Sequence, residues 1–345
     1  MKALEQLGRI QSPGNSTLFF ASLGVAIRFG LAALLLTIAI LPRLSCLTRS
    51  EVHQGIGLGI LGAIGLVLQM DAMAYTQAST CAFLTQGYCI WLPIWFSVRH
   101  RRLPPMLVVM ASGMVLLGGA ILAGVSWGQL RLGRGEWETL AGSVVFAAQI
   151  LWLERPVYRG NDVYRFSTVM FATMAVLCFP VAAVSAGKPL DLAIAFRAPA
   201  AITLMIVLVL LCTVLTFLLA NRWQPEVPAT EAGLLYATEP VFTAAVSLGI
   251  PGWISQFAGI QYPNERLTAN LLVGGGMILA AVILLQLVAR QAAQPDSEYT
   301  VNPVAREGGD QPIQSGPDEI QFGGPVIELG TQAQDVPDPK APDPR

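Results

Sequence analysis

Long apolar stretches recur along the chain and are separated by short, more polar segments. A helix that spans a bilayer needs about 20 consecutive, mostly apolar residues. Nine stretches approach or exceed this length, at residues 17–42, 54–76, 78–98, 105–124, 138–158, 164–186, 199–220, 229–250 and 268–289. The pattern therefore predicts an all-α polytopic membrane protein with nine spans, in which nearly all of residues 17–289 form one membrane domain.

The composition agrees with a lipid environment. Hydrophobic residues make up 54% of the 345 residues, charged residues make up 12%, and the mean hydropathy is +0.57. A soluble domain has about 25% charged residues, and it needs polar groups to cover its surface. We therefore do not expect a soluble enzyme. The sequence also contains no P-loop, Ser-His-Asp array or zinc-ligand spacing, and no cofactor is expected.

The two ends of the chain are polar. Residues 1–16 form a short polar N-terminus, and residues 291–345 are rich in Pro, Gly, Gln and Asp. The C-terminal segment has ten acidic and three basic residues, a net charge of −7, so residues 1–290 carry +6 of the formal total of −1. Such a segment buries too little apolar area to offset its ordering entropy. It is predicted to be a disordered acidic tail.

Arginine and lysine are unevenly shared between the two sets of loops. One set contains ten such residues, among them Arg99, Arg101 and Arg102, and the other contains seven. Cytoplasmic loops carry the excess of Arg and Lys, so the first set and the acidic tail are predicted to be cytoplasmic. The expected location is the cytoplasmic (plasma) membrane, with Met1 outside if the nine spans are correct.

Three short segments of the first half recur, in the same order, in the second half. Matched helices stand five apart in the predicted order, so each pair crosses the membrane in opposite directions. This indicates an inverted repeat, an architecture of many secondary transporters; the alternative is chance similarity between helices rich in Leu, Ala and Gly. The offsets are 137, 151 and 163 residues, for Ala26–Phe29 with Val163–Phe166, Ala78–Leu84 with Ala229–Leu235, and Gly113–Leu116 with Gly276–Leu279.

The two repeats differ in their number of helices. The second repeat, residues 138–289, has five predicted helices, whereas the first, residues 17–124, has four. The counterpart of the helix at 138–158 would lie near residues 1–20, where Lys2 and Pro13 are among several residues that prevent a span. We therefore expect that the first helix is missing, as it would be if the start codon had been placed too late.

Several short motifs resemble the EamA-like family of the drug/metabolite transporter superfamily. Tyr236–Phe242 contains Glu-Pro-Val-Phe and resembles the family's "EPVF" pattern, and Asn264–Leu267 resembles its "GERL" turn. Further matches are Ile27–Phe29 with the apolar run that follows, Ala74–Ser79, and the final helix at Gly274–Leu279. The resemblance covers residues 17–289.

The resemblance implies two five-helix repeats and the export of metabolites or amino acids across the cytoplasmic membrane, often with proton coupling. The chain departs from the family at three places. The first helix is missing, Arg99–Leu103 stands where an acidic turn is usual, and about twelve extra residues lie near Trp253–Pro263.

Charged residues within the spans are candidates for a substrate site because they are costly in lipid. Asp71 lies about one turn from a helix end, where it could carry a proton or face a cationic substrate. The alternatives are a carboxylate that reaches the outer interface or that pairs with Arg28. Arg28 could hold a substrate carboxylate in a bidentate contact, but its match to Arg165, at a helix start, favours an interfacial anchor.

Glu239 precedes Pro240 within a span, and a proline removes one backbone hydrogen bond and kinks a helix. The pair could line a cavity; the alternative is a kink that only shapes packing. Other polar or aromatic side chains in mid-helix could line a pocket for amino acids or drugs, or could simply bond between helices, which is worth about 0.6 kcal/mol. These candidates are Gln86, Tyr88, Trp91, Gln149 and Tyr236.

Two other features are interpreted as structural. Gly57–Gly62 fits GxGxxG but lies inside a predicted span, so together with Gly55 it indicates close helix packing. The five cysteines include no CxxC pair, and the two histidines, His53 and His100, flank basic clusters, so neither a disulfide framework nor a metal site is expected.

Together these features predict a secondary transporter that exports small metabolites, amino acids or drugs by alternating access. The alternatives are a non-transporting or truncated membrane scaffold and a membrane-embedded enzyme that modifies lipid. The expected partners are a small-molecule substrate, membrane lipid and a coupled proton, without nucleic acid. A homodimer is left open.

Overall fold

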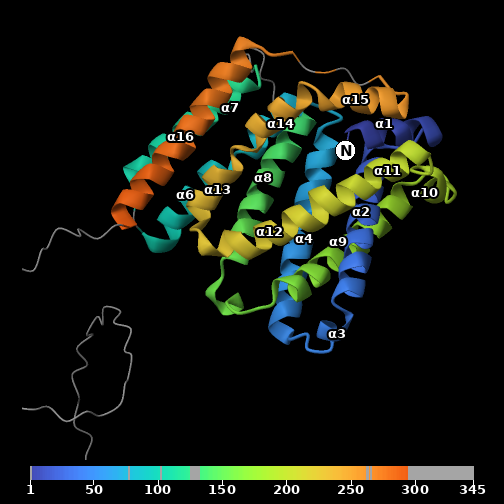
Figure 1. Cartoon of the computed structure of the whole chain (residues 1–345), viewed down its shortest axis with the longest axis horizontal. Coiled ribbons are helices and arrows are strands. Elements are labelled where there is room, and N and C mark those ends of the chain that lie inside the picture. Colours follow the sequence, from blue (N-terminus) through green and yellow to red (C-terminus); the bar gives the residue numbers. More distant parts are fainter. Residues whose placement is uncertain are drawn as a thin grey trace, which may run out of the picture. The chain divides into compact units, whose positions relative to one another are not determined.

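The computed structural model describes residues 2–76, 78–101, 103–124, 133–261, 264 and 266–293. This part of the chain is helical and contains no strand (Figure 1). A π-helical turn at Leu210–Leu215 joins α11 to α12, and 3₁₀ turns lie at Pro156–Tyr158 and Gln224–Glu226. The helices are α1 (Lys2–Gln11), α2 (Thr17–Ala39), α3 (Leu41–Leu44), α4 (Arg49–Ala72), α5 (Ala78–Thr85), α6 (Tyr88–His100), α7 (Met106–Leu122), α8 (Arg134–Leu153), α9 (Val163–Ser185), α10 (Asp191–Ile194), α11 (Pro199–Val209), α12 (Thr216–Trp223), α13 (Ala229–Tyr236), α14 (Glu239–Ser247), α15 (Ile250–Ala258) and α16 (Ala269–Ala293).

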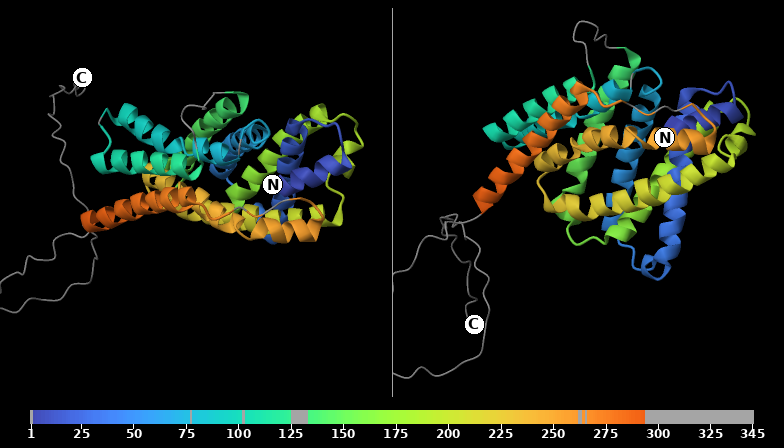
Figure 2. Two further views of the ribbon diagram at one scale, coloured as in Figure 1. Left: turned by 90° about the horizontal axis from the view of Figure 1, so that it is seen from above. Right: turned by 45° about the horizontal axis from the view of Figure 1, so that its top comes forward.

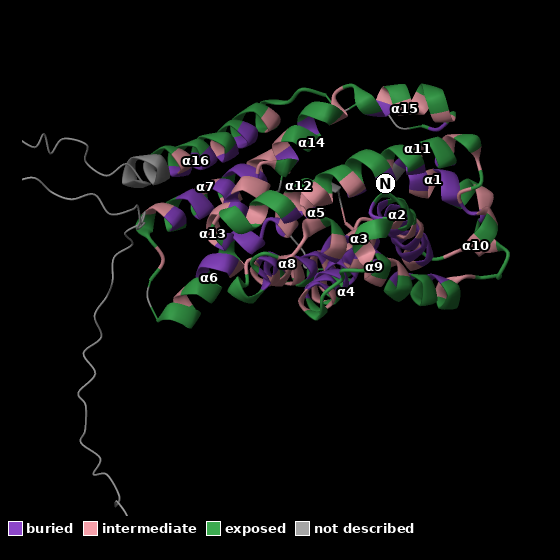
Figure 3. Cartoon of the chain, turned by 60° about the horizontal axis from the view of Figure 1, so that its bottom comes forward, coloured by how far each residue is buried: buried purple, intermediate pink, exposed green. Residues whose placement is uncertain are grey.

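Six helical segments of the described chain are long and apolar enough to cross a membrane. A seventh would be α13–α14 together with α15, which bends away by 57°. Many large apolar side chains on α11, α15 and α16 are exposed, as lipid contact requires (Figure 3). The prediction of a helical, polytopic membrane protein is confirmed, whereas the number of nine spans stays a prediction. Of the remaining stretches, α7 is apolar but has 17 residues, and α8 begins with Arg134 and two acidic residues.

The polar N-terminus forms the amphipathic helix α1. Its apolar side, with Leu4 and Leu7, is buried against α2 and α11, while Arg9 and Glu5 pair on its outer side. A helix of this length measures about 15 Å, so α1 is too short to cross a bilayer, as the sequence predicted. The part of the polar tail beyond Ala293 lies outside the described residues.

Helix α4 lies between α8 and α9 and packs closely against both (Figure 1). A Cβ atom on Gly55 would lie 2.6 Å from the Phe166 carbonyl oxygen of α9, and one on Gly65 would lie 2.7 Å from the Phe146 ring of α8. Neither distance leaves room for a side chain. The interpretation of Gly55 as a helix-packing residue is therefore confirmed, and Gly65 packs in the same way.

Two further helix pairs run antiparallel. In the first, Phe29 of α2 packs against Phe171 of α9 with ring centroids 5.6 Å apart, and Phe19 packs with Ala182 nearer the other end of α9. In the second, Gly118 of α7 lies against Gly274 of α16 (Figure 2). The α2–α9 pair and the α7–α16 pair belong to two separate hydrophobic cores.

The helix bounds correct one of the three sequence matches. Helices α2 and α9 both have 23 residues, and both begin and end 146 residues apart. Arg28 lies eleven residues after the first residue of α2, whereas Arg165 lies two residues after the first residue of α9. The two arginines therefore do not occupy equivalent positions, and the offset of 137 is wrong. The match rested on a shared Arg-Phe pair in apolar surroundings, which does not fix the register of a helix.

Candidate functional site

Two of the apolar segments are interrupted by a two-residue turn. In the first, α5 ends at Thr85 and α6 begins after the turn Gln86-Gly87. In the second, α13 ends at Tyr236 and α14 begins after the turn Ala237-Thr238. The leading helix has 8 residues in both cases, and all bounds of the two turns differ by 151 residues. This agrees with the offset of the second sequence match.

The two interrupted segments touch each other. The Cys89 thiol of α6 donates to the Gly233 carbonyl of α13 at 3.5 Å, and a Cβ on Gly233 would lie 2.6 Å from Leu92. Glu239 follows the first residue of α13 by ten residues, which is about 15 Å of helix. The hydrocarbon core is about 30 Å thick, so the second turn would lie near the middle of the span predicted at residues 229–250.

Gln86 is a buried amide without a partner. Its side chain is 1% exposed, and neither Oε1 nor Nε2 has a hydrogen-bond partner among the described residues. It lies against Gly119 of α7, where a Cβ would be 2.6 Å from the Gln86 Oε1. A buried polar group without a partner costs about 1–3 kcal/mol. The amide can both donate and accept, so a polar group of a ligand would be stabilised beside it.

Tyr88, Tyr236 and Glu239 gather around the second turn. Tyr88 is buried, and Glu239 and Tyr236 lie close enough to act on it electrostatically. The Tyr236 hydroxyl donates to the Gln224 Oε1 at 2.9 Å. The Glu239 side chain is exposed and has neither a hydrogen bond nor an ion pair within the described part of the chain. A charged carboxylate at the centre of a bilayer costs about 2.5–3.5 kcal/mol.

Two other candidates, Trp91 and Gln149, make contacts that involve helix α8. The Trp91 indole donates to the Ser143 hydroxyl of α8 at 2.9 Å, next to Gly87. Gln149 of α8 lies against Gly62 of α4, where a Cβ would be 3.2 Å from its Nε2. Trp91 therefore belongs to the interrupted helix α5–α6, whereas Gln149 belongs to the α4–α8 contact.

Asp71 lies elsewhere, in a polar cluster at the end of α4. It accepts from the Thr17 hydroxyl at 2.5 Å and pairs with Arg134 at 2.7 Å. The alternative in which Asp71 pairs with Arg28 is wrong, because the partner comes from the start of α8. Arg134 also pairs with Glu138 at 2.6 Å and contacts the Tyr75 hydroxyl at 3.0 Å.

The same cluster shifts two ionisation equilibria. The hydrogen bond and charge of Glu138 raise the pKa of Arg134 above its ordinary value. A hydrogen bond from Thr76 lowers the pKa of Glu136, whose carboxylate also accepts from the Gly133 amide at 2.9 Å. Both charges are therefore stabilised at neutral pH where α8 begins.

Arg28 is neither an interfacial anchor nor bound to a carboxylate in the described structure. It is 7% exposed in the middle of α2. Its guanidinium donates to the Thr213 hydroxyl and, at 2.6 Å, to the Cys212 carbonyl, both in the π-helical turn. The widened turn frees a carbonyl from the regular α-helical pattern, and Arg28 binds it. The expectation of an interfacial position is wrong because Arg165 is not its equivalent.

A buried ion pair between α4 and α9 was not predicted. Glu51 is 1% exposed, pairs with Arg165 at 2.9 Å and accepts from the Asp162 amide at 3.0 Å. The signal was present in the sequence, because Thr48 and Glu51 have the spacing of a capping box. The structure contains this box, with Thr48 and Glu51 bonding to each other's backbone amides.

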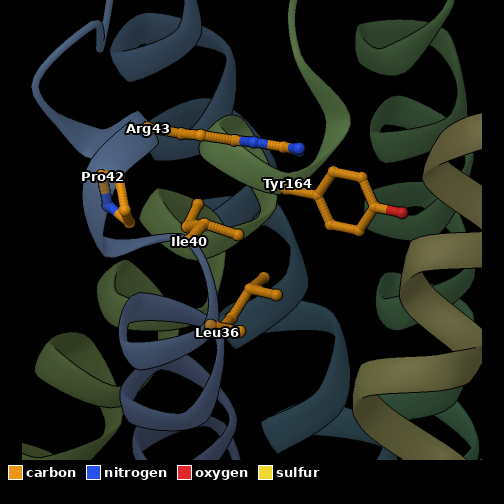
Figure 4. A pocket seen from close by; sticks show the side chains of 6 residues that line it. Leu36, Ile40, Pro42, Arg43 and Tyr164 are labelled. Atoms are coloured by element: carbon orange, nitrogen blue, oxygen red, sulfur yellow. The ribbon is translucent and has the colours of Figure 1, made fainter.

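A cavity of about 340 Å³ lies where α2 ends and α9 begins (Figure 4). Leu36, Ala39, Ile40 and Pro42 form its apolar wall, and Arg43 and Tyr164 complete the lining. None of the eight candidate residues lines it.

Comparisons with known proteins bear on the fold of the chain only. No protein-family model and no curated protein matches the chain. A solved structure described as "Crystal structure of protein" is 14% identical to this chain, with a TM-score of 0.57, and the match covers 85% of this chain and 96% of that one. At this identity the similarity shows a shared fold alone.

Proposed function

We propose that the chain is a secondary transporter of the EamA-like type, which moves small metabolites, amino acids or drugs by alternating access. In this proposal the nine apolar stretches all cross the cytoplasmic membrane, and the two halves form an inverted repeat. The acidic tail is cytoplasmic, and transport is outward and coupled to protons. The substrate site lies between the interrupted helices α5–α6 and α13–α14.

One observation carries the proposal. Both halves contain an eight-residue helix, a two-residue turn and a second helix, at an identical offset, and the two segments are in contact. Interrupted helices at the interface of two repeats are where transporters bind substrate near the midplane. The offsets of α2 with α9 and of α7 with α16, 146 and 163 residues, add two further pairs in the same order.

The polar groups at the turns also favour a binding site over a packing defect. Gln86 is buried without a partner, and Glu239 has none in the described structure. By contrast, Asp71, Glu51 and Arg28 each have a partner on another helix. Gln86 and Glu239, which lie in or next to the two turns, therefore remain available for a ligand.

A thermal-shift screen of the purified protein tests the site. The panel would contain amino acids, nucleosides, sugar phosphates, polyamines and cationic dyes. A ligand at 100 times its dissociation constant stabilises the folded state by about 2.7 kcal/mol. We expect a dose-dependent shift from one chemical class, and we expect Gln86→Met to remove it.

Gln54→Met is the matched control. Gln54 is also a buried amide, but it lies near the start of α4 and accepts a hydrogen bond from Asn161 at 2.8 Å. This variant should be less stable and should still respond to the ligand. A shift that persists in Gln86→Met, or is lost equally in both variants, would place the ligand elsewhere.

A further inference from the structure

The cavity between the end of α2 and the start of α9 is separate from the proposed transport site. Its volume of about 340 Å³ falls within the range of small-molecule sites, which begins at about 300 Å³. Leu36 and Ala39, in the last turn of α2, and Ile40, its C-cap, give the cavity an apolar wall. Arg43 of α3 and Tyr164 of α9 add a cation and a phenol. An apolar wall beside a single cation suits an amphiphilic anion.

The two polar side chains of the cavity are available to a ligand. The Arg43 side chain extends toward the Tyr164 ring (Figure 4). Neither the guanidinium nor the phenol has a hydrogen bond or an ion pair within the described part of the chain. The carboxylates at the starts of α4 and α9 are bound to other groups, because Glu51 pairs with Arg165 and Asp162 caps α9. An anion from outside the chain can therefore pair with Arg43 and accept from Tyr164.

A helix α2 that crosses the membrane brings this cavity to the level of the lipid headgroups. Its 23 residues measure about 34 Å, slightly more than the hydrocarbon thickness of about 30 Å. Large apolar side chains at the end of the helix, those of Leu35, Ile38 and Leu41, are exposed and offer a surface to lipid. Arg43 belongs to the arginine-rich loops that are predicted to be cytoplasmic, and the cytoplasmic leaflet contains the anionic lipids.

We propose that the cavity binds one phospholipid with an anionic headgroup. The phosphate lies between Arg43 and Tyr164, where the planar guanidinium can bind two of its oxygens. The first part of one acyl chain covers Leu36, Ala39 and Ile40, so that apolar surface is removed from water. A bound lipid would join the end of α2 to the start of α9.

The apolar wall and the single charge favour this ligand over two others. A water-soluble phosphate compound would pair with Arg43 but would gain nothing from the wall. A zwitterionic headgroup would bring a second cation close to Arg43, which weakens the attraction. The inference does not rest on the proposed function, because it requires only that α2 and α9 cross a membrane.

Native mass spectrometry of the full chain in a non-ionic detergent tests the site with three probes. Dioctanoyl phosphatidylglycerol is anionic, dioctanoyl phosphatidylcholine has the same chains without net charge, and glycerol phosphate has the anion without the chains. We expect phosphatidylglycerol to bind about fivefold more tightly than phosphatidylcholine, as one basic residue near an anionic headgroup provides. An excess of glycerol phosphate should not displace it.

Three variants locate the lipid. Arg43→Gln should remove the preference for phosphatidylglycerol. Arg49→Gln is the matched control, because Arg49 is exposed in the same loop region but does not line the cavity, and it should keep the preference. Ala39→Phe fills the apolar wall from an exposed position without changing charge, so it should fold and should weaken phosphatidylglycerol binding about tenfold.

The remaining outcomes would overturn the inference. An equal loss of preference in Arg43→Gln and Arg49→Gln would show a general attraction of the basic surface for anionic lipid. Unchanged binding in Ala39→Phe would place the lipid elsewhere, and displacement by glycerol phosphate would identify a site for free phosphate compounds. None of these results bears on the transport site, which the Gln86→Met variant tests separately.

Discussion

Glu51 and Asp71 lie twenty residues apart on α4, and each is ion-paired to an arginine of another helix. Twenty residues of helix measure about 30 Å, which equals the thickness of the hydrocarbon core. The two pairs therefore hold α4 to α9 at one membrane face and to α8 at the other. Together with the close glycine contacts, they join α4 to both α8 and α9.

The two pairs should differ in strength because they differ in exposure. The Arg165 side chain is 19% exposed, whereas that of Arg134 is 57% exposed. Breaking a buried pair costs about 3–5 kcal/mol, and an exposed pair contributes about 0–1 kcal/mol. We expect Glu51→Gln to lower the free energy of unfolding by about 3 kcal/mol and Asp71→Asn by about 1 kcal/mol, measured by denaturation in mixed micelles. A larger loss in Asp71→Asn would contradict this ranking.

The contact between Arg28 and Thr213 predicts strong energetic coupling. Arg28→Met leaves Thr213 and the Cys212 carbonyl without their donor, so it should destabilise the fold by about 2–3 kcal/mol. Thr213→Val removes one of these groups and should recover part of the loss. A double-mutant cycle on thermal unfolding should give a coupling energy of about 1–2 kcal/mol. Additive effects would show that the two side chains do not act together.

Gly55 and Gly113 should respond in opposite ways to alanine. A Cβ on Gly55 would collide with the backbone of α9, whereas one on Gly113 of α7 would meet nothing within 4 Å. Gly55→Ala should therefore destabilise the protein by about 1–3 kcal/mol. Gly113→Ala should stabilise it by about 0.5–1 kcal/mol, because alanine loses less entropy in a helix. Both follow from melting temperatures in one detergent, and equal shifts would contradict the packing of α4 on α9.

The lowered pKa of Glu136 predicts a dependence of stability on pH. Because its folded-state pKa lies below the ordinary value of 4.5, its contribution is complete above pH 4.5 and is lost as the pH falls through the folded value. Glu136→Gln should melt at a lower temperature than the parent at pH 7. The difference should shrink steadily below pH 4.5. A difference that is constant with pH would show that the charge of Glu136 does not stabilise the start of α8.

The sequence predicted the helices well because apolar length alone determines them. All nine stretches are largely helical, and the glycines of α4 pack as expected. The amphipathic α1 was missed because its buried side consists of few residues, among them Leu4 and Leu7, within a polar segment. The turn Gln86-Gly87 was missed because its two residues stand within a continuous apolar run and include no proline.

The partners of the charged residues were harder to predict. Arg134 lies 63 residues from Asp71, and Thr213 lies 185 residues from Arg28, so only the packing of helices brings them together. Five of the eight candidate residues lie on the two interrupted helices or in their turns, namely Gln86, Tyr88, Trp91, Tyr236 and Glu239. The other three candidates, Arg28, Asp71 and Gln149, contact other helices. The presence of a polar residue in a span therefore did not distinguish binding from packing.

Flux into proteoliposomes tests the central claim most directly, namely that the matched turns form a transport site. The full chain would be reconstituted with a pH-sensitive dye inside, and a ligand identified by thermal shift would be added outside. We expect saturable ligand flux with counter-movement of protons in the parent and in Gln54→Met, and at least tenfold less flux in Gln86→Met. Folded protein that binds the ligand but gives no flux, or equal flux from Gln86→Met, would contradict the account.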